Sequence, residues 1–181
     1  LELPAGQFAL FMNSMYAVDA YVRDYFRKAV LDALLAEKLP VTVFGEGWEK
    51  YSCGDEHSLR REPAVPFALS FERITKAHVL LNVSPIFNRG MHDRVPAGMA
   101  NHAVVLTDEN PYLRRTFTDG KELLFYSLEK PDTLCEQAER TLTDVRLREK
   151  IAASAYETFE REYTWKRRAE QILAFAEEVE A

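Results

Sequence analysis

The chain of 181 residues has little of what marks secreted, membrane or nucleic-acid-binding proteins. Its two cysteines, Cys53 and Cys135, cannot build a disulfide framework, so reduced thiols and a cytoplasmic location are expected. No apolar run approaches the roughly 18 residues that cross a bilayer, so no membrane span is predicted. The 23 lysines and arginines are outnumbered by 29 aspartates and glutamates. The resulting net charge of −6 attracts neither nucleic acid nor anionic lipid.

Common cofactor and nucleophile motifs are also missing. The sequence contains no G-x-G-x-x-G dinucleotide fingerprint, no P-loop and no G-x-S-x-G. Its few cysteines and histidines match no zinc-site spacing, so no metal is predicted. No repeat or Gly/Ser linker marks a boundary, which predicts a single domain over residues 1–181. The chain begins at Leu1 and not at methionine, and we expect a processed product or a piece of a longer protein.

What the sequence does contain is an alternation of apolar runs with amphipathic segments. Strands are predicted from short apolar runs over residues 7–13, 41–44, 64–67, 78–83, 103–107 and 122–126. Helices are predicted over residues 18–34, 70–77, 93–101, 111–117, 131–143, 145–161 and 164–180. Residues 48–62 are polar and predict a loop or a broken helix. Strands that alternate with helices favour an α/β fold with a Rossmann-like parallel sheet, flanking helices and a helical C-terminal tail.

The loop after the strand at 78–83 is the richest candidate site, because ligands of open parallel sheets bind beyond the carboxyl ends of the strands. Its candidate residues are Arg89, Gly90, Met91, His92, Asp93 and Arg94. Pro96 is tolerated only in a first helical turn, so Asp93 is expected to be the N-cap. The amides of Arg94, Val95 and Ala97, and those of residues 90–92, would then be free. Free amides beside two arginines predict a phosphate site. The alternative is a well-capped helix whose arginines pair with carboxylates.

Two other loops begin at the same edge of the predicted sheet. Gly45 and Gly47 follow a strand and could form a turn that a ligand approaches. The alternative is a plain turn in which Trp48 covers the core. Asp108 and Glu109 follow the strand at 103–107 and are included in the candidate site as polar loop residues.

The residues from about 74 to 173 resemble the carboxyl-terminal domain of GT-B glycosyltransferases, in particular the spore-maturation CgeB-like and group 1 branches. The segment 90–95, Gly-Met-His-Asp-Arg-Val, is similar to the motif Gly-x-x-Asp-Arg-Val/Phe of the CgeB-like branch. Residues 99–108 resemble its Leu-Ala-x-Gly-Ala-x-x-Leu-Thr-Asp, and Tyr163-Thr164-Trp165 resembles its closing His-Thr-Trp. More loosely, residues 7–35 and 41–48 resemble the first strand–helix–strand unit of that domain.

The resemblance implies a domain that binds a nucleotide diphospho-sugar as donor, without a metal, for transfer of a hexosyl group to an unknown acceptor. Residues 90–93 match the loop whose amides meet the diphosphate or the sugar, and Arg94 matches an arginine that serves as a phosphate or structural partner. Arg89 and Ala97 stand where the wider retaining families carry two glutamates, the second of which holds the ribose. His102 stands where the family favours glycine. No catalytic residue is assigned.

The resemblance further implies an amino-terminal acceptor domain outside this chain. The last predicted helix carries an apolar stripe made by Trp165, Ala169, Ile172, Leu173, Ala176 and Val179. Trp165 and Ala169 are expected to pack on the chain's own sheet, and Leu173, Ala176 and Val179 to be exposed or covered in a homodimer. Two alternatives remain: a nucleotide- or sugar-binding module without catalysis, which Ala97 favours, and an unrelated α/β protein.

Overall fold

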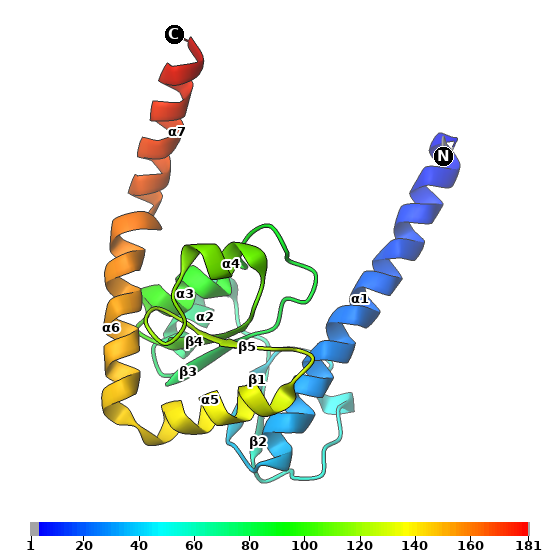
Figure 1. Ribbon diagram of the computed structural model, residues 1–181. Coiled ribbons are helices and arrows are strands. Elements are labelled where there is room, and N and C mark those ends of the chain that lie inside the picture. Colours follow the sequence, from blue (N-terminus) through cyan, green and yellow to red (C-terminus); the bar gives the residue numbers. More distant parts are fainter. Residues whose placement is uncertain (1–3, 181) are drawn as a thin grey trace.

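The structure is a computed structural model that describes residues 4–180 and has an α/β architecture with parallel sheets (Figure 1). The elements are, in chain order, α1 (Ala5–Ala36), β1 (Val41–Phe44), a 3-10 helix η1 (Trp48–Lys50), β2 (Leu59–Glu62), α2 (Phe67–Ile74), β3 (Val79–Asn82), α3 (Arg94–Ala100), β4 (Val104–Asp108), α4 (Pro111–Thr116), β5 (Leu124–Tyr126), α5 (Pro131–Thr143), α6 (Val145–Glu162) and α7 (Trp165–Glu180). The predicted fold class is confirmed. Four of the six predicted strands and the last five predicted helices are found within about two residues of their expected positions.

The strands β3, β4 and β5 form one parallel sheet with β4 in its centre. Every residue of β4 is buried, and its apolar residues 104–106 are covered on both faces of the sheet. Successive side chains of a strand point to opposite faces. Accordingly, Val104 and Leu106 pack with residues of α1 and α5, whereas Val105 packs with residues of α3 and α4. The helix α6 contributes to both clusters, so it closes one side of the domain.

A second parallel sheet consists of β1 and β2 alone. The prediction of a loop or a broken helix over residues 48–62 was therefore wrong for residues 59–62, which form β2. This strand has the sequence Leu-Arg-Arg-Glu, and only its Leu59 is buried, in a cluster with Leu31 and Val43. Its polar composition hides the strand from a search for apolar runs. The Arg61 guanidinium stabilises the segment by donating to the carbonyl oxygens of Trp48 and Tyr51 and by pairing with Glu56.

Two other strand predictions were wrong. Residues 64–67 form no strand, because Pro63 and Pro66 have no amide to donate to a ladder and α2 begins directly after Pro66. Residues 7–13 belong to α1, which runs unbroken for 32 residues. A short apolar run does not by itself distinguish a strand from a helical segment, and Ala, Leu and Met are good helix formers. No proline interrupts the segment before Pro40.

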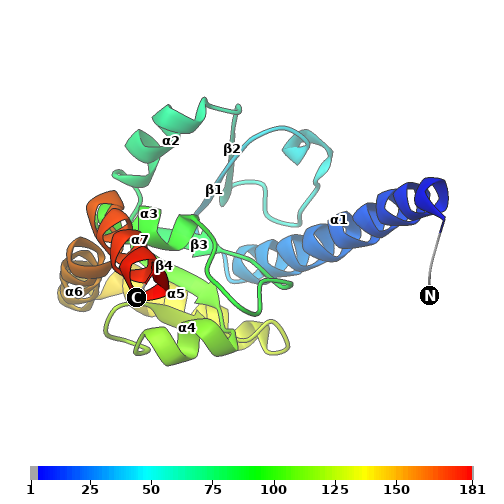
Figure 2. The same ribbon diagram turned by 90° about the horizontal axis from the view of Figure 1, so that it is seen from above.

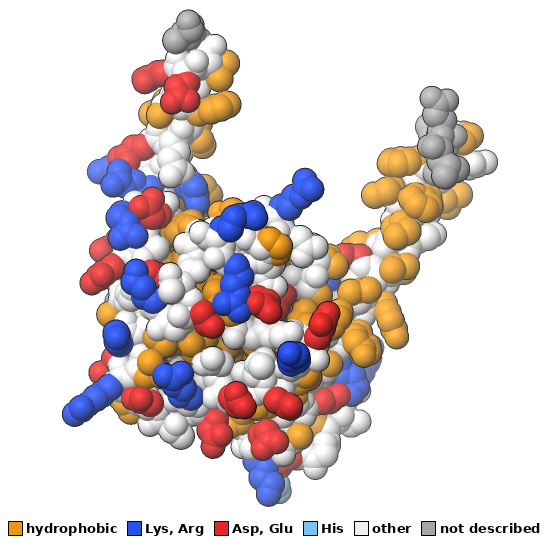
Figure 3. Space-filling model, viewed as in Figure 1, with side chains coloured by type: hydrophobic (Ala, Val, Ile, Leu, Met, Phe, Trp, Pro, Cys, Tyr) orange, Lys and Arg blue, Asp and Glu red, His pale blue; other side chains and the backbone are white. Residues whose placement is uncertain are grey.

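The helices α1 and α7 extend away from the body of the domain toward the same side (Figures 1 and 2). The carboxyl-terminal half of α1 is anchored by buried Val30, Leu31 and Leu34, while its first half exposes large apolar side chains. Apolar side chains therefore cluster on both projecting helices (Figure 3).

The closing helix α7 corrects one sequence expectation. Its main contacts are with α6, so Trp165 is 90% exposed and Ala169 is exposed as well, and neither packs on the sheet. Leu173, Ala176 and Val179 are exposed as expected.

The close packing of α3 on the sheet yields a stability prediction. Gly98 of α3 is buried, and a Cβ atom there would lie 3.0 Å from Leu80 Cδ2 and closer still to Val105 Cγ2. Overpacking costs about 1–3 kcal/mol, against about 1 kcal/mol that alanine gains over glycine in a helix. We expect Gly98→Ala to lower the free energy of unfolding by up to about 2 kcal/mol in urea denaturation. The control Gly54→Ala, where a Cβ meets nothing within 4 Å, should leave it unchanged. Equal effects of the two substitutions would contradict the packing.

Candidate functional site

The candidate site lies at the carboxyl ends of β3 and β4, where both strands end in a buried polar residue. Asn82 is the last residue of β3 and is 1% exposed, and Asp108 is the last residue of β4 and is 3% exposed. Buried polar groups are stable only when they are hydrogen-bonded. Their partners therefore determine how the adjoining loop, residues 83–93, is held.

Asn82 is the centre of a hydrogen-bond network. Its Nδ2 donates to Thr107 Oγ1 at 3.0 Å, and its Oδ1 accepts from Ser84 Oγ at 3.2 Å and from Arg94 Nη1 at 3.3 Å. The Tyr126 hydroxyl donates to the Asn82 carbonyl oxygen at 2.9 Å. One residue thus links three strands, the loop and α3.

Asp108 holds the start of the loop. Its Oδ1 accepts a hydrogen bond from the Ser84 amide at 2.8 Å. Burial raises the pKa of Asp108 to about 6, although this amide favours the charged form. The neighbouring Glu109 is exposed and is held by Arg114, with 2.6 Å between carboxylate and guanidinium. Both carboxylates predicted for the site are therefore engaged within the protein.

Asn110, which the sequence analysis missed, fixes the far end of the loop. Its Nδ2 donates to the carbonyl oxygens of Phe87 at 2.6 Å and of Gly90 at 3.2 Å. Its Oδ1 accepts from the Leu113 amide at 2.8 Å and so caps α4. The signal for the cap is the Asn-Pro pair at the helix start, but no sequence pattern shows that the same side chain also reaches the loop.

The start of α3 differs from the prediction of free amides for an anion site. The Arg94 amide donates to His92 Nδ1 at 3.3 Å, the Val95 amide to the His92 carbonyl oxygen at 3.0 Å, and the Ala97 amide to that of Asp93 at 3.1 Å. None of the three is free. The reason is that Asp93 is itself helical, with φ −57° and ψ −24°, and its side chain caps no amide. Within residues 4–180, the amides of residues 90–92 have no hydrogen-bond partner.

Arg94 is the most unusual side chain of the site. Its guanidinium is partly buried, and its one hydrogen-bond partner among the described residues is the neutral amide of Asn82. No carboxylate in the described chain lies within ion-pair distance of it. Burial lowers the pKa of Arg94, the positive charge of Arg27 lowers it further, and Asp93 raises it. A partly buried guanidinium without an ion-paired carboxylate favours an anionic ligand.

Arg27 brings α1 into the site, which the sequence analysis did not foresee. Figures 1 and 2 show the loop after β3 beside the middle of α1. Arg27 and Arg94 also lower the pKa of His92, after burial, which is the largest cause. The nearest carboxylate to Arg27 is Asp24, at 3.6 Å and largely exposed. Arg27 and Arg94 therefore form a cationic cluster, His92 beside them is held in its neutral form, and Arg89 points into solvent.

The turn at Gly45 and Gly47 belongs to the other sheet. Both glycines have positive φ, +123° and +90°, which glycine adopts without strain. Trp48 Nε1 donates to the Phe44 carbonyl oxygen at 3.2 Å, and its ring packs on the cluster under β1. Among residues 4–180 no hydrogen bond or ion pair joins this turn to the 83–93 loop. The structure thus places the predicted residues 90–94 and Asp108 at one edge of the sheet, but Arg89 points away and these two glycines lie elsewhere.

His102 explains one departure from the family pattern. Its φ is 56°, a left-handed conformation that glycine adopts most easily. The His102 ring stacks on Tyr156 with 4.2 Å between centroids, which offsets part of that strain. The departure is therefore conformational and lies at the end of α3 away from Arg94.

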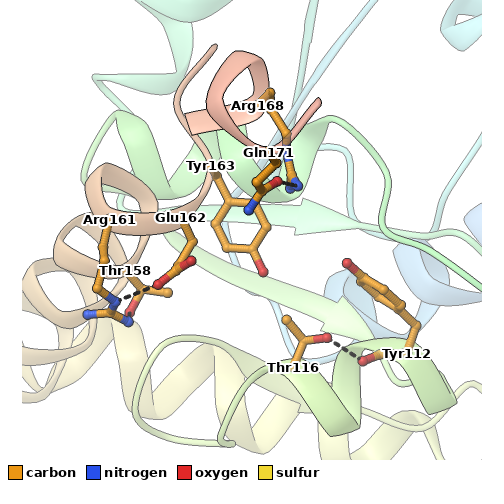
Figure 4. Close-up of a pocket in the computed structure, with 8 residues that line it drawn as sticks. All are labelled: Tyr112, Thr116, Thr158, Arg161, Glu162, Tyr163, Arg168 and Gln171. Carbon is orange, nitrogen blue, oxygen red and sulfur yellow. Dashed lines mark hydrogen bonds and ion pairs between the residues drawn. The ribbon is translucent and has the colours of Figure 1, made fainter. Parts of the chain in front are cut away.

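Two cavities lined by described residues lie outside this site. One, of about 370 Å³, lies between α4, α6 and α7 (Figure 4). The other, of about 430 Å³, lies between α1 and residues 53–55.

Within residues 4–180 no three metal-ligating side chains come together. None of the described helices is long and apolar enough to span a membrane.

Residues 23–174 match the sequence family described as glycosyl transferase-like. The chain belongs to this family. Anabaena HepE in complex with UDP-glucose has a similar structure, with TM-score 0.69 and 11% identity over 83% of this chain and 44% of that one. A glycosyltransferase of Rickettsia africae gives TM-score 0.68 and 10% identity over 84% and 44%. TarM gives 0.59 and 14% over 83% and 31%. The GT-B resemblance is confirmed at the level of the fold.

The chain spans less than half the length of these structures. A search of curated protein sequences found no match.

The buried Asp108 carboxyl predicts a pH dependence of stability. Its pKa of about 6 lies above the unfolded value of about 3.9. Between these values the folded state binds the extra proton, so stability falls as pH rises. In Asp108→Asn, which mimics the protonated acid, we expect unfolding at pH 7.5 to cost about 2–3 kcal/mol more than in the wild type. The difference should vanish near pH 4 in urea denaturation. The exposed Glu129→Gln is the control. A difference that does not change with pH would contradict the assignment.

Proposed function

We propose that this chain is the donor-binding domain of a glycosyltransferase, and that the cationic cluster binds the diphosphate of a nucleotide diphospho-sugar. The single observation that carries the proposal is the partly buried guanidinium of Arg94, which has no carboxylate partner and lies near Arg27. Two neighbouring cations are unfavourable in isolation and favourable around a diphosphate.

Each residue has a defined task in this proposal. Arg94 is held by Asn82 and presents its remaining donors to a phosphate oxygen, while Arg27 approaches from α1. The amides of residues 90–92 are the remaining donors on the loop, which Asn110 holds in place. When the bond from the sugar C1 to the diphosphate breaks, negative charge develops on the leaving diphosphate. Positioned donors and cations stabilise that charge.

The similar structures support the substrate class, since one of them is in complex with UDP-glucose. We further propose a hexosyl donor, an acceptor domain outside this chain and, in view of the two free cysteines, a cytoplasmic location. A binding module without catalysis is the second candidate. Ala97 favours it, because this position cannot supply the carboxylate that holds a ribose in the wider families.

The first prediction concerns Arg94. We expect Arg94→Ala to weaken UDP binding by about 1.5–3 kcal/mol, or roughly 10- to 150-fold, because a charge-assisted hydrogen bond is lost. Binding of uridine, which has no phosphate, should change little. Isothermal titration calorimetry with UDP, GDP, ADP and their nucleosides measures both effects. The control Arg115→Ala removes an exposed arginine of α4. Equal weakening of UDP and uridine, at unchanged stability, would remove Arg94 from the phosphate site.

The second prediction concerns metal ions. Asp108 is bonded to the Ser84 amide and Glu109 to Arg114, so neither carboxylate is available to hold a cation beside the diphosphate. We therefore expect the same UDP affinity in EDTA and in Mg²⁺ or Mn²⁺. An affinity that collapses in EDTA and returns with either metal would overturn the proposed role of the arginines.

A further inference from the structure

The cavity between α4, α6 and α7 is lined by aromatic, hydroxyl and charged side chains that take no part in the proposed donor site. It measures about 370 Å³ and is lined by Tyr112, Thr116, Thr158, Arg161, Glu162, Tyr163, Arg168 and Gln171 (Figure 4). Small-molecule pockets generally occupy about 300–1,000 Å³. This cavity is therefore large enough for one small ring and too small for an extended chain.

The aromatic and cationic groups of the cavity are partly positioned already. The Tyr163 hydroxyl points into it, and the Tyr112 ring faces it from α4 (Figure 4). Burial raises the pKa of Tyr163 and nearby Tyr112 raises it further, so its hydroxyl stays a proton donor. The Arg168 guanidinium lies 5.1 Å from the Tyr163 ring centroid and donates to Gln171 Oε1 at 2.8 Å. Among the described residues no carboxylate pairs with Arg168.

The balance of the polar groups distinguishes a sugar from a simple anion. Arg161 is neutralised by Glu162, at 2.8 Å, and the Glu162 carboxylate would repel a phosphate. The remaining groups are hydroxyls, the Gln171 amide and one guanidinium, which together donate and accept. Sugar hydroxyls also donate and accept, and tyrosine rings offer apolar surface to the C–H groups of a pyranose.

We propose that this cavity binds a single neutral hexopyranose unit, at a site separate from the donor site. The helix α4 connects the two sites. Its cap Asn110 holds the 83–93 loop, whereas Tyr112 and Thr116 line the cavity. The ligand also bridges α4 to the first turns of α7, which otherwise contacts mainly α6. Occupancy therefore fixes the direction in which α7 projects.

Saturation-transfer NMR with methyl α-D-glucopyranoside and methyl β-D-galactopyranoside tests the proposal, with inorganic phosphate as a competing probe. We expect binding of at least one glycoside, weakened at least fivefold by Tyr163→Phe and by Arg168→Gln. The control Arg115→Gln removes an exposed arginine of α4 that does not line the cavity, and it should leave binding unchanged. Hydrogen exchange of the amides of residues 166–171 should slow when the glycoside is added.

The outcomes separate this site from the donor site, because UDP binding is measured on the same samples. Glycoside binding that both variants weaken, while UDP affinity stays unchanged, supports the proposal whether or not UDP binds at Arg94. It is overturned if neither glycoside binds, if the two variants bind as well as the control, or if phosphate displaces the glycoside.

Discussion

The geometry of the site depends on the buried amide of Asn82. This side chain satisfies its hydrogen bonds with Thr107 on the adjacent strand, Ser84 at the start of the loop and Arg94 on the following helix. Its backbone carbonyl accepts the Tyr126 hydroxyl from the third strand. An apolar side chain of similar size would remove the three side-chain bonds, to Thr107, Ser84 and Arg94, while the backbone carbonyl would still accept from Tyr126. Each lost partner costs about 1–3 kcal/mol where it is buried. The network therefore stabilises the sheet edge and orients Arg94 at the same time.

The sequence predicted the central part of the fold because local pattern and tertiary environment agree there. The strand that begins at Val104 opens with three apolar residues and is buried on both faces. The helix that begins at Pro111 carries its own cap and proline. Prediction failed where the stabilising interactions are not local. The strand of residues 59–62 owes its stability to its partner strand and to the contacts of Arg61, and none of these leaves a pattern in the sequence.

The candidate site was predicted in part for the same reason. Loop position and residue type identified Arg94 and its neighbours. The expectation of free helix amides was wrong, because Asp93 adopts helical dihedral angles and the Arg94 amide donates to His92 Nδ1. Arg27 and Asn110 were missed because each reaches the loop from an element distant in sequence. The cationic character of the site is therefore a property of two helices, α1 and α3, brought together by the core.

The length of α1 has a mechanical consequence. A helix of 32 residues is about 48 Å long, and only its last turns are fastened to the domain, through Val30, Leu31, Leu34 and Leu35. A tilt of about 5° at that anchor displaces the first turn of the helix by roughly 4 Å, yet shifts Arg27, close to the anchor, by less than about 1 Å. The helix therefore behaves as a lever with its short arm at the arginine. A displacement of the exposed first half therefore moves Arg27 much less than it moves the first turn. The position of the cationic cluster is preserved when the start of the helix moves.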